Sequence, residues 1–283
     1  GFFMKKLRGK TVVITGAAGG LGSALAEAFV NQGCHLALID INQLALNTLA
    51  EKLQKSDLRI SCHYVDLSKT TEIDALPEEL MSVHSSIDVI VNNAGMTLQK
   101  SAENHCIDDW QRVFGLNFWS AVLMCRALLP LLRQQKTAHI VNLSSMAAFY
   151  GLPSQCSYSS SKAAVQAYSE SLRAELSGEG IGVSCIYPGA IQTNMIMATL
   201  SESDDLEQAQ KNLALAQRFG ISPDKAAKKI LRGIRRNSPC VTIGADAKLF
   251  KFISRTFPGL TAMLLARTYS RLTNTTRQCS HTG

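Results

Sequence analysis

The stretch that decides the fold is TVVITGAAGGLG, residues 11–22. It begins with a run rich in β-branched residues, Thr11–Thr15, which is typical of a buried strand, and it continues into a glycine-rich turn. From Leu21 onward apolar residues recur at helical spacing until Gly33, which predicts a helix directly after the turn. A strand, a tight turn and a helix in this order are the opening unit of a parallel α/β sheet.

The same alternation continues along the chain. Further strands are expected at residues 35–40, 59–66, 87–91, 139–143, 183–187 and 240–243. Helices are expected at 44–55, 73–83, 107–133 and 158–176, with another opened by Pro223. The strands are apolar with little alternation, so both faces of the sheet must be covered. These features predict an α/β fold, a doubly wound parallel sheet of about seven strands with helices on both faces.

Composition favours one catalytic domain. Hydrophobic residues make up 46% of the 283 residues, which is enough for a sizeable core. No repeat or Gly/Ser/Pro-rich linker divides the chain, so residues 7–245 are predicted to form a single domain. Residues 246–283 would be a basic, partly apolar and helical C-terminal extension.

Cysteine, histidine and charge usage narrow the function classes. The eight cysteines form no C-x-x-C pair, which predicts free thiols in a reducing, cytoplasmic compartment, and early lysines disfavour a signal peptide. The histidines show no metal-ligand spacing, so no metal site is predicted. The net charge is +7, of which the chain from Asp246 onward supplies +5. The remaining body is close to neutral, which argues against binding of nucleic acid.

The glycine turn is suited to a dinucleotide. Glycines at 16, 20 and 22 let the backbone approach a pyrophosphate closely, and the following helix points its N-terminal amides at that anion. Since no G-K-[ST] follows, the phosphate loop of nucleotide hydrolases is excluded. Asp40 ends the second strand, 24 residues after Gly16, where its carboxylate could accept ribose hydroxyls and would repel a 2′-phosphate. NAD(H) is therefore predicted over NADP(H).

Tyr158 and Lys162 lie four residues apart at the start of a predicted helix, which places them on one face. A free phenol, with a pKa of ~10, is a poor base at neutral pH, but a nearby ammonium favours the phenolate. Taken alone, Tyr-x-x-x-Lys occurs by chance in many proteins, so the rest of the chain must decide.

With these motifs in this order, the chain resembles the short-chain dehydrogenase/reductase family over about residues 7–243, with a Rossmann-type sheet. The matching segments are Thr15–Gly22, Asp66-Leu67, Asn92–Gly95, the pair Tyr158 and Lys162, and Pro188–Thr193. Ser145 precedes Tyr158 by 13 residues and Asn117 precedes it by 41, both usual for the family. Ser144 is interpreted as structural.

The resemblance implies residue roles. The catalytic set would be Asn117, Ser145, Tyr158 and Lys162, with Asn117 the least secure because it also fits a helix bend. The substrate would contact Ser145, Met146, Tyr158 and Met195. The cofactor would lie against Gly16, Ala18, Gly19, Gly20, Leu21, Gly22, Asp40, Asp66, Leu67, Asn93, Ala94, Gly95, Tyr158, Lys162, Pro188, Gly189, Ile191 and Thr193.

It also implies hydride transfer between NAD(H) and a secondary alcohol or ketone. Residues 192–220 would form a lid over the substrate, and its methionines suit an apolar pocket, although core packing explains them equally well. A sterol-, fatty-acyl- or retinoid-like substrate and a role in lipid metabolism are the hypothesis. The alternatives are an NADP(H)-dependent 3-oxoacyl or carbonyl reductase, and a catalytically silent dinucleotide-binding regulator at a membrane.

The tail, residues 247–272, mixes apolar and basic residues, and its uncharged stretch 256–266 is too short to span a bilayer. One interpretation is a basic amphipathic element that binds peripherally to an anionic membrane surface. The other is a segment packed on the domain or at the interface of a homodimer or homotetramer, which the resemblance implies. Because the resemblance implies an oligomer, the packed interpretation is slightly favoured.

Overall fold

The structure, a computed structural model, describes residues 4, 6–55 and 57–279, with side chains up to residue 270. The predicted domain, apart from residue 56, and all four predicted catalytic residues lie within this range. The predicted membrane contact at residues 271–272 and the last part of the extension, 280–283, lie outside the described side chains.

Seven strands of the described chain form one parallel sheet in the order β3-β2-β1-β4-β5-β6-β7. This confirms the predicted doubly wound sheet. The strands are β1 (Thr11–Thr15), β2 (His35–Asp40), β3 (Ile60–Tyr64), β4 (Val89–Asn92), β5 (Ala138–Leu143), β6 (Ile181–Pro188) and β7 (Cys240–Ile243).

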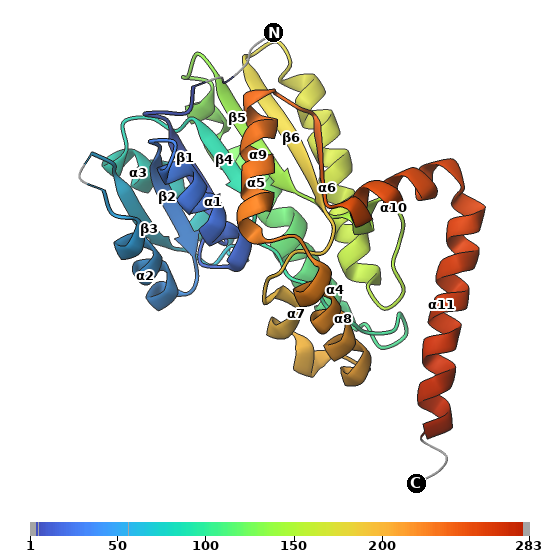
Figure 1. Cartoon of the computed structure of the whole chain (residues 1–283). Coiled ribbons are helices and arrows are strands. Elements are labelled where there is room, and N and C mark those ends of the chain that lie inside the picture. The colour runs from blue at the N-terminus through green and yellow to red at the C-terminus, as the bar shows by residue number, and fades with distance from the viewer. Residues whose placement is uncertain (1–3, 5, 56, 280–283) are drawn as a thin grey trace.

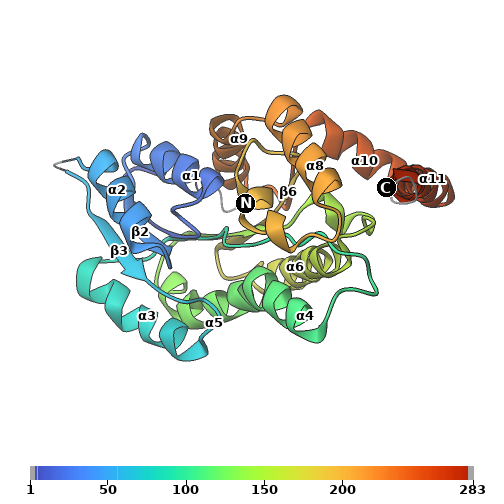
Figure 2. The same ribbon diagram turned by 90° about the horizontal axis from the view of Figure 1, so that it is seen from below.

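Helices cover both faces of the sheet (Figures 1 and 2). On one face lie α1 (Gly20–Val30), α2 (Gln43–Leu53) and α9 (Pro223–Arg235); on the other lie α3 (Thr70–Val83), α5 (Ser120–Leu132) and α6 (Cys156–Glu175). The remaining elements are α4 (Ile107–Phe114), η1 (Gly115–Trp119), η2 (Met146–Ala148), α7 (Met195–Ala198), η3 (Leu200–Glu202), α8 (Leu206–Phe219), α10 (Ala245–Thr256) and α11 (Pro258–Cys279).

The core has two halves because side chains alternate across a strand. Along β1, Val12 and Ile14 pack with Phe29 of α1, while Val13 packs on the opposite face with Ile73 of α3. All of these side chains are buried. Both faces of β1 are therefore apolar, which explains the unbroken hydrophobic run in the sequence.

The helix predicted over residues 107–133 is not regular. A π-helical turn, η1, interrupts it between α4 and α5. By length and composition alone, the run Ile107–Leu132 could also cross a membrane. Met124, Leu128 and Leu132 are buried in the half of the core that contains α3, so this run packs as a core helix.

The C-terminal extension is tied to the sheet at its start and then leaves it. Asp246 accepts a hydrogen bond from the backbone N–H of Ala190 (2.8 Å), which follows β6. A side chain at Gly189 or Gly244 would overlap the Asp246 carboxylate, so both positions must stay small. Beyond α10, the long helix α11 runs away from the sheet (Figure 1). The predicted extension is thus two helices.

Candidate active site

The strand order reverses between β1 and β4, so the carboxyl ends of these strands flank a crevice. Asn93, just after β4, donates through Nδ2 to the carbonyl oxygens of Thr15 (3.1 Å) and Gly16 (3.2 Å). In return, the Thr15 hydroxyl accepts from the backbone N–H groups of Asn93 and Ala94. Hydrogen bonds between side chains and backbone groups therefore hold the glycine turn against the segment after β4. Sequence reasoning missed Thr15, although a hydroxyl at a strand end was the available signal.

The turn itself leaves room for an anion. Gly16 has φ +62°, and a Cβ there would lie 2.9 Å from Cα of Ala94. A Cβ on Gly22 would overlap the carbonyl oxygen of Gly16, whereas Gly19 and Gly20 are exposed. Since α1 begins at Gly20 with no acidic residue in its first turn, its N-terminus can hold a pyrophosphate. The residues present fit the predicted dinucleotide.

Asp40 ends β2 beside this turn. Its carboxylate accepts from the backbone N–H groups of Ala18 and Asn42, each at 3.0 Å. At the end of β3, Asp66 accepts from the Ser68 hydroxyl, which lowers the pKa of the Asp66 carboxyl, and Leu67 is buried in the core. The predicted adenosine-side residues thus follow neighbouring strands at the carboxyl edge of the sheet.

Tyr158 and Lys162 lie one turn apart in α6, as the spacing predicts. Nζ of Lys162 is 5.8 Å from the centroid of the Tyr158 ring and donates to the carbonyl oxygen of Leu143 at the end of β5 (2.8 Å). Ser145 lies two residues farther on and begins η2, where its Oγ accepts from the N–H of Ala147 (3.1 Å). Ser144 donates to the carbonyl oxygen of Lys162 (2.7 Å), which is a structural bond.

The electrostatics of this pair differ in part from the expectation. Burial lowers the pKa of Lys162 to about 8. Burial also raises the pKa of Tyr158, and a hydrogen bond with the Ser145 side chain opposes that rise. Within the chain alone, desolvation disfavours the phenolate and sets the direction of the Tyr158 pKa shift.

Asn117 lies in the π-helical turn η1, and its buried side chain is fully engaged as a donor. Its Oδ1 accepts from the N–H of Met96 (2.7 Å), and its Nδ2 donates to the carbonyl oxygen of Met96 (2.9 Å) and to Ser161 Oγ (3.0 Å). A Cβ on Gly95 would lie 3.2 Å from Asn117 Oδ1 and 3.3 Å from Lys162 Nζ. Asn117 thus holds the segment after β4 against α6. Sequence reasoning missed both the π turn, a feature common at functional sites, and Ser161.

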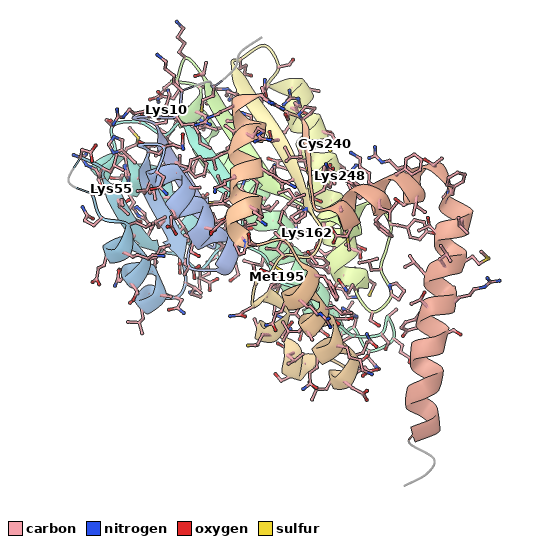
Figure 3. The ribbon with its side chains drawn as sticks, viewed as in Figure 1. Lys10, Lys55, Lys162, Met195, Cys240 and Lys248 are labelled. Carbon is pink, nitrogen blue, oxygen red and sulfur yellow. The ribbon has the colours of Figure 1, made fainter. Side chains whose placement is uncertain are left out.

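The predicted segment Pro188–Thr193 reaches across the crevice. Gly189 donates to the carbonyl oxygen of Ile243 (2.8 Å), and Ile191 pairs with Ile221. A Cβ built on Gly20 would lie 3.0 Å from Cγ2 of Thr193, so this segment covers the glycine turn. Figure 3 shows Lys162 and Met195 close together near the middle of the view, with Lys10 above them. Met195, at the start of α7, is exposed, and Met146, next to Ser145, is half-buried.

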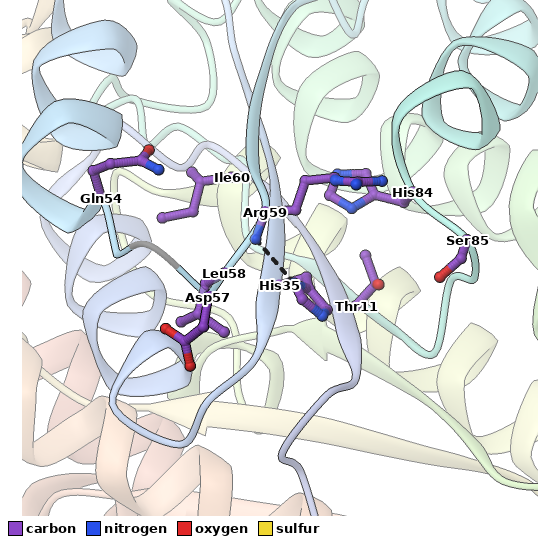
Figure 4. Close-up of a pocket in the computed structure, with 9 residues that line it drawn as sticks. All are labelled: Thr11, His35, Gln54, Asp57, Leu58, Arg59, Ile60, His84 and Ser85. Carbon is purple, nitrogen blue, oxygen red and sulfur yellow. Dashed lines mark hydrogen bonds between the residues drawn. The ribbon is translucent and has the colours of Figure 1, made fainter.

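A cavity of about 520 Å³ lies at the opposite edge of the sheet (Figure 4). Thr11, His35 and Ile60, the first residues of three strands, contribute to its lining. Ser145 follows the carboxyl end of β5, and Lys162 donates to Leu143 at that end, so this cavity is separate from the predicted catalytic residues.

Comparison with known proteins decides the family. A family model described as short chain dehydrogenase matches residues 10–204. The chain belongs to the short-chain dehydrogenase family. It is 30% identical, over 96% of its length and 84% of the relative's, to a dehydrogenase/reductase SDR family protein 7-like from Drosophila melanogaster. A protein of the same description from Anopheles gambiae is 32% identical over 86% of this chain and 77% of its own.

Solved structures agree with the fold of this short-chain dehydrogenase. One from Burkholderia phymatum, in complex with NAD, has a TM-score of 0.83 at 25% identity and covers 91% of this chain and 97% of its own. The L-sorbose reductase of Gluconobacter frateurii, in complex with NADPH and L-sorbose, has a TM-score of 0.75 at 25% identity over 84% and 96% of the two chains. The chain is thus an NAD(P)-dependent dehydrogenase/reductase.

The arrangement suits the removal of a proton and a hydride from an alcohol. A nicotinamide dinucleotide supplies the hydride acceptor and, when oxidised, a positive ring charge. The Tyr158 phenolate can accept the alcohol proton, and the Lys162 ammonium favours that phenolate. The Ser145 hydroxyl can donate to the substrate oxygen as its charge changes. Asn117 is a positioning residue, because it holds the backbone of Met96 in the segment beside Lys162.

Proposed function

We propose that this short-chain dehydrogenase uses NAD(H) in preference to NADP(H) and acts on a lipophilic secondary alcohol or ketone. The observation that carries the cofactor preference is the place of Asp40. Two backbone N–H groups hold its carboxylate beside the glycine turn, and the neighbouring residues 17–20 and 41–43 contain no lysine or arginine. A 2′-phosphate there would meet a fixed negative charge without a cation to offset it.

Steady-state kinetics with both cofactors test this preference. The ratio of kcat/KM for NAD to kcat/KM for NADP should exceed one, and Asp40→Asn should lower it about tenfold, a change of about 1.4 kcal/mol. The amide oxygen can keep one of the two backbone hydrogen bonds, so the variant removes the charge together with one acceptor. Asp74→Asn, on an exposed site of α3, is the matched control. A preference for NADP in the unaltered enzyme would refute the proposal and favour an NADP(H)-dependent carbonyl reductase.

The lipophilic substrate is supported by the side chains around the lid. Met195 and Met197 are exposed on α7, and Met146 next to Ser145 is only half-buried. Exposed methionines on a short helix are not needed for core packing, and their flexible thioethers adapt to irregular apolar ligands. This favours the substrate-facing interpretation over core packing.

A substrate panel tests this second part. Lipophilic secondary alcohols of sterol, fatty-acyl and retinoid type are compared with small charged hydroxy acids, with absorbance of the reduced cofactor as the readout. The lipophilic compounds should give kcat/KM at least about tenfold higher, because each buried methylene contributes about 0.8 kcal/mol. A strong preference for the charged acids would contradict the proposal while leaving the cofactor result intact.

A further inference from the structure

The helices α10 and α11 expose apolar side chains on their outer surface. Leu249 and Phe252 lie one turn apart on α10, at 60% and 62% exposure. On α11, Leu260, Met263 and Leu264 are between 40% and 46% exposed and follow the i, i+3, i+4 spacing of one helix face. We name these residues together with Phe257, which is also exposed, the outer face.

The opposite side of α11 already faces the protein. Thr261 is buried, and Leu265, Thr268 and Tyr269 line a cavity of about 390 Å³ whose other walls include Asp204, Gln208 and Asn212 of the lid region. Figure 1 shows α11 standing beside the body and away from the sheet. The outer face is therefore the side of α11 that is turned away from this cavity.

After Asp246 the charge on these helices has one sign, since residues 247–283 contain no aspartate or glutamate. Lys248 and Arg267 have exposed side chains, and the guanidinium of Arg255 lies 5.6 Å from the Phe149 ring centroid. Figure 3 shows Lys248 on α10. Lys251 is half-buried, with its Nζ 5.4 Å from the Phe149 ring centroid and 5.8 Å from that of Tyr187, so it anchors α10 to the body. Apolar side chains flanked only by exposed cations are typical of helices that lie on anionic membranes.

The acidic run on the lid does not offer a complementary protein surface. Glu202 forms an ion pair with Arg112, and Asp204 accepts from the backbone N–H of Ser101 (2.6 Å) and from Asn104 (3.0 Å). Asp205 caps α8 by accepting from the N–H of Gln208. These carboxylates are engaged within the chain, so a second copy would bring few free acids from this region to the cations of the outer face.

We propose that the outer face of α10 and α11 docks this protein on the surface of an anionic lipid bilayer. Phe252, Leu260 and Leu264 would enter the interface between headgroups and acyl chains, while Lys248 and Arg267 contact the lipid phosphates. The side of α11 that lines the cavity stays turned toward the lid. This proposal does not depend on the identity of the substrate or the cofactor.

Co-sedimentation of the full chain with vesicles tests the docking. Binding is expected to vesicles of phosphatidylcholine with phosphatidylglycerol, and weaker binding to phosphatidylcholine alone. It should fall as salt is raised from about 0.1 M to about 1 M, because screening shortens the range of the charges. Equal and negligible sedimentation with both vesicle types would overturn the proposal.

Two variants separate apolar from electrostatic contributions. Leu260→Ser/Leu264→Ser should reduce vesicle binding at least about tenfold, since two side chains no longer leave water. Lys248→Gln/Arg267→Gln should reduce binding to the anionic vesicles about fivefold or more and remove the preference for them. The control Leu44→Ser/Ile107→Ser changes two equally apolar, exposed residues on α2 and α4 and should leave binding unchanged.

Sedimentation velocity of the same variants tests the alternative that a second copy of the chain covers the outer face. If Leu260→Ser/Leu264→Ser splits an oligomer and leaves vesicle binding intact, the outer face is a subunit interface and the proposal is wrong. If the oligomeric state is unchanged while vesicle binding falls, the proposal is supported. Unchanged thermal unfolding midpoints confirm that the exposed substitutions leave the fold intact.

Discussion

The cofactor crevice and the lid are held by different kinds of contact. In the crevice, the bonds of Thr15, Asn93 and Asn117 involve backbone groups at the ends of buried strands. In the lid, one buried bond from the Thr199 hydroxyl to the carbonyl oxygen of Thr97 (2.7 Å) is accompanied by partly exposed side-chain pairs. Glu202 pairs with Arg112 of α4, and Asn104 donates to Asp204. Buried bonds to the backbone fix a geometry, whereas exposed side-chain pairs contribute little stability.

This difference fits the separate tasks of the crevice and the lid. The crevice must hold its reacting groups in place, which buried bonds achieve. The lid must admit and release a substrate, which requires contacts that break at low cost. The two regions should therefore respond differently to substitution.

The largest effect is expected at the phenol. Tyr158→Phe removes the proton acceptor and should lower kcat about 10²- to 10⁴-fold while cofactor binding is retained. Stopped-flow turnover and cofactor fluorescence titration measure the two quantities. Tyr168→Phe, on the same helix, is the control and should keep turnover. Full activity of Tyr158→Phe would contradict the role of the phenol as proton acceptor. Absence of turnover in the unaltered protein would instead favour the silent regulator.

The next effect concerns the backbone of the glycine turn. In Gly22→Ala the new Cβ would overlap the Gly16 carbonyl oxygen, so the turn must shift. The free energy of unfolding should fall by about 1–3 kcal/mol, and cofactor affinity should fall with it. Gly178→Ala, where a Cβ meets nothing within 4 Å, should leave both almost unchanged in denaturant titrations. If Gly22→Ala and Gly178→Ala have equal free energies of unfolding, the glycine turn can shift to accept a side chain and the prediction is wrong.

A pH effect is expected from buried histidines of the sheet layers. Burial lowers the pKa of His84 to about 4 and that of His139 to about 3, whereas an unfolded histidine titrates near a pKa of ~6.5. Between these values the unfolded chain binds protons that the folded chain does not. Stability should thus be complete above about pH 6.5 and fall as pH is lowered toward 4.

Thermal unfolding at several pH values measures this trend. His139→Gln should flatten the decrease, because one buried group no longer resists protonation. A midpoint that stays constant from pH 7 to about 4.5 would show that these histidines do not control acid stability.

The smallest effect is expected at the lid. Arg112 and Glu202 form a partly exposed ion pair, so a double-mutant cycle with Arg112→Gln and Glu202→Gln should give a coupling below about 1 kcal/mol. KM for the substrate should change more than the unfolding midpoint. Arg133→Gln is the control: it breaks an exposed ion pair with Glu179, outside the lid, and should leave KM unchanged. A coupling of several kcal/mol would make the lid as rigid as the crevice.

Much of the fold was predictable because its signals are local. The apolar runs and the glycine turn placed each strand within a few residues, and the spacing of Tyr158 and Lys162 placed both on one helix face. The π turn at Asn117 was not predictable, since it depends on Asn117 reaching Met96 and Ser161 from distant parts of the chain. The rise that burial imposes on the pKa of Tyr158 was not predictable either, because burial is a property of the assembled site.

The sequence by itself determined the order of strands and helices, the small residues of the turn and the types of side chain brought to the crevice, because each follows from local spacing and backbone freedom. Tertiary structure decided how far Lys162 and Tyr158 are desolvated, how Asn93 clamps the turn and which side of α11 faces the body. Those features arise from segments far apart in the chain, and desolvation and cross-strand bonds exist only once the segments have packed.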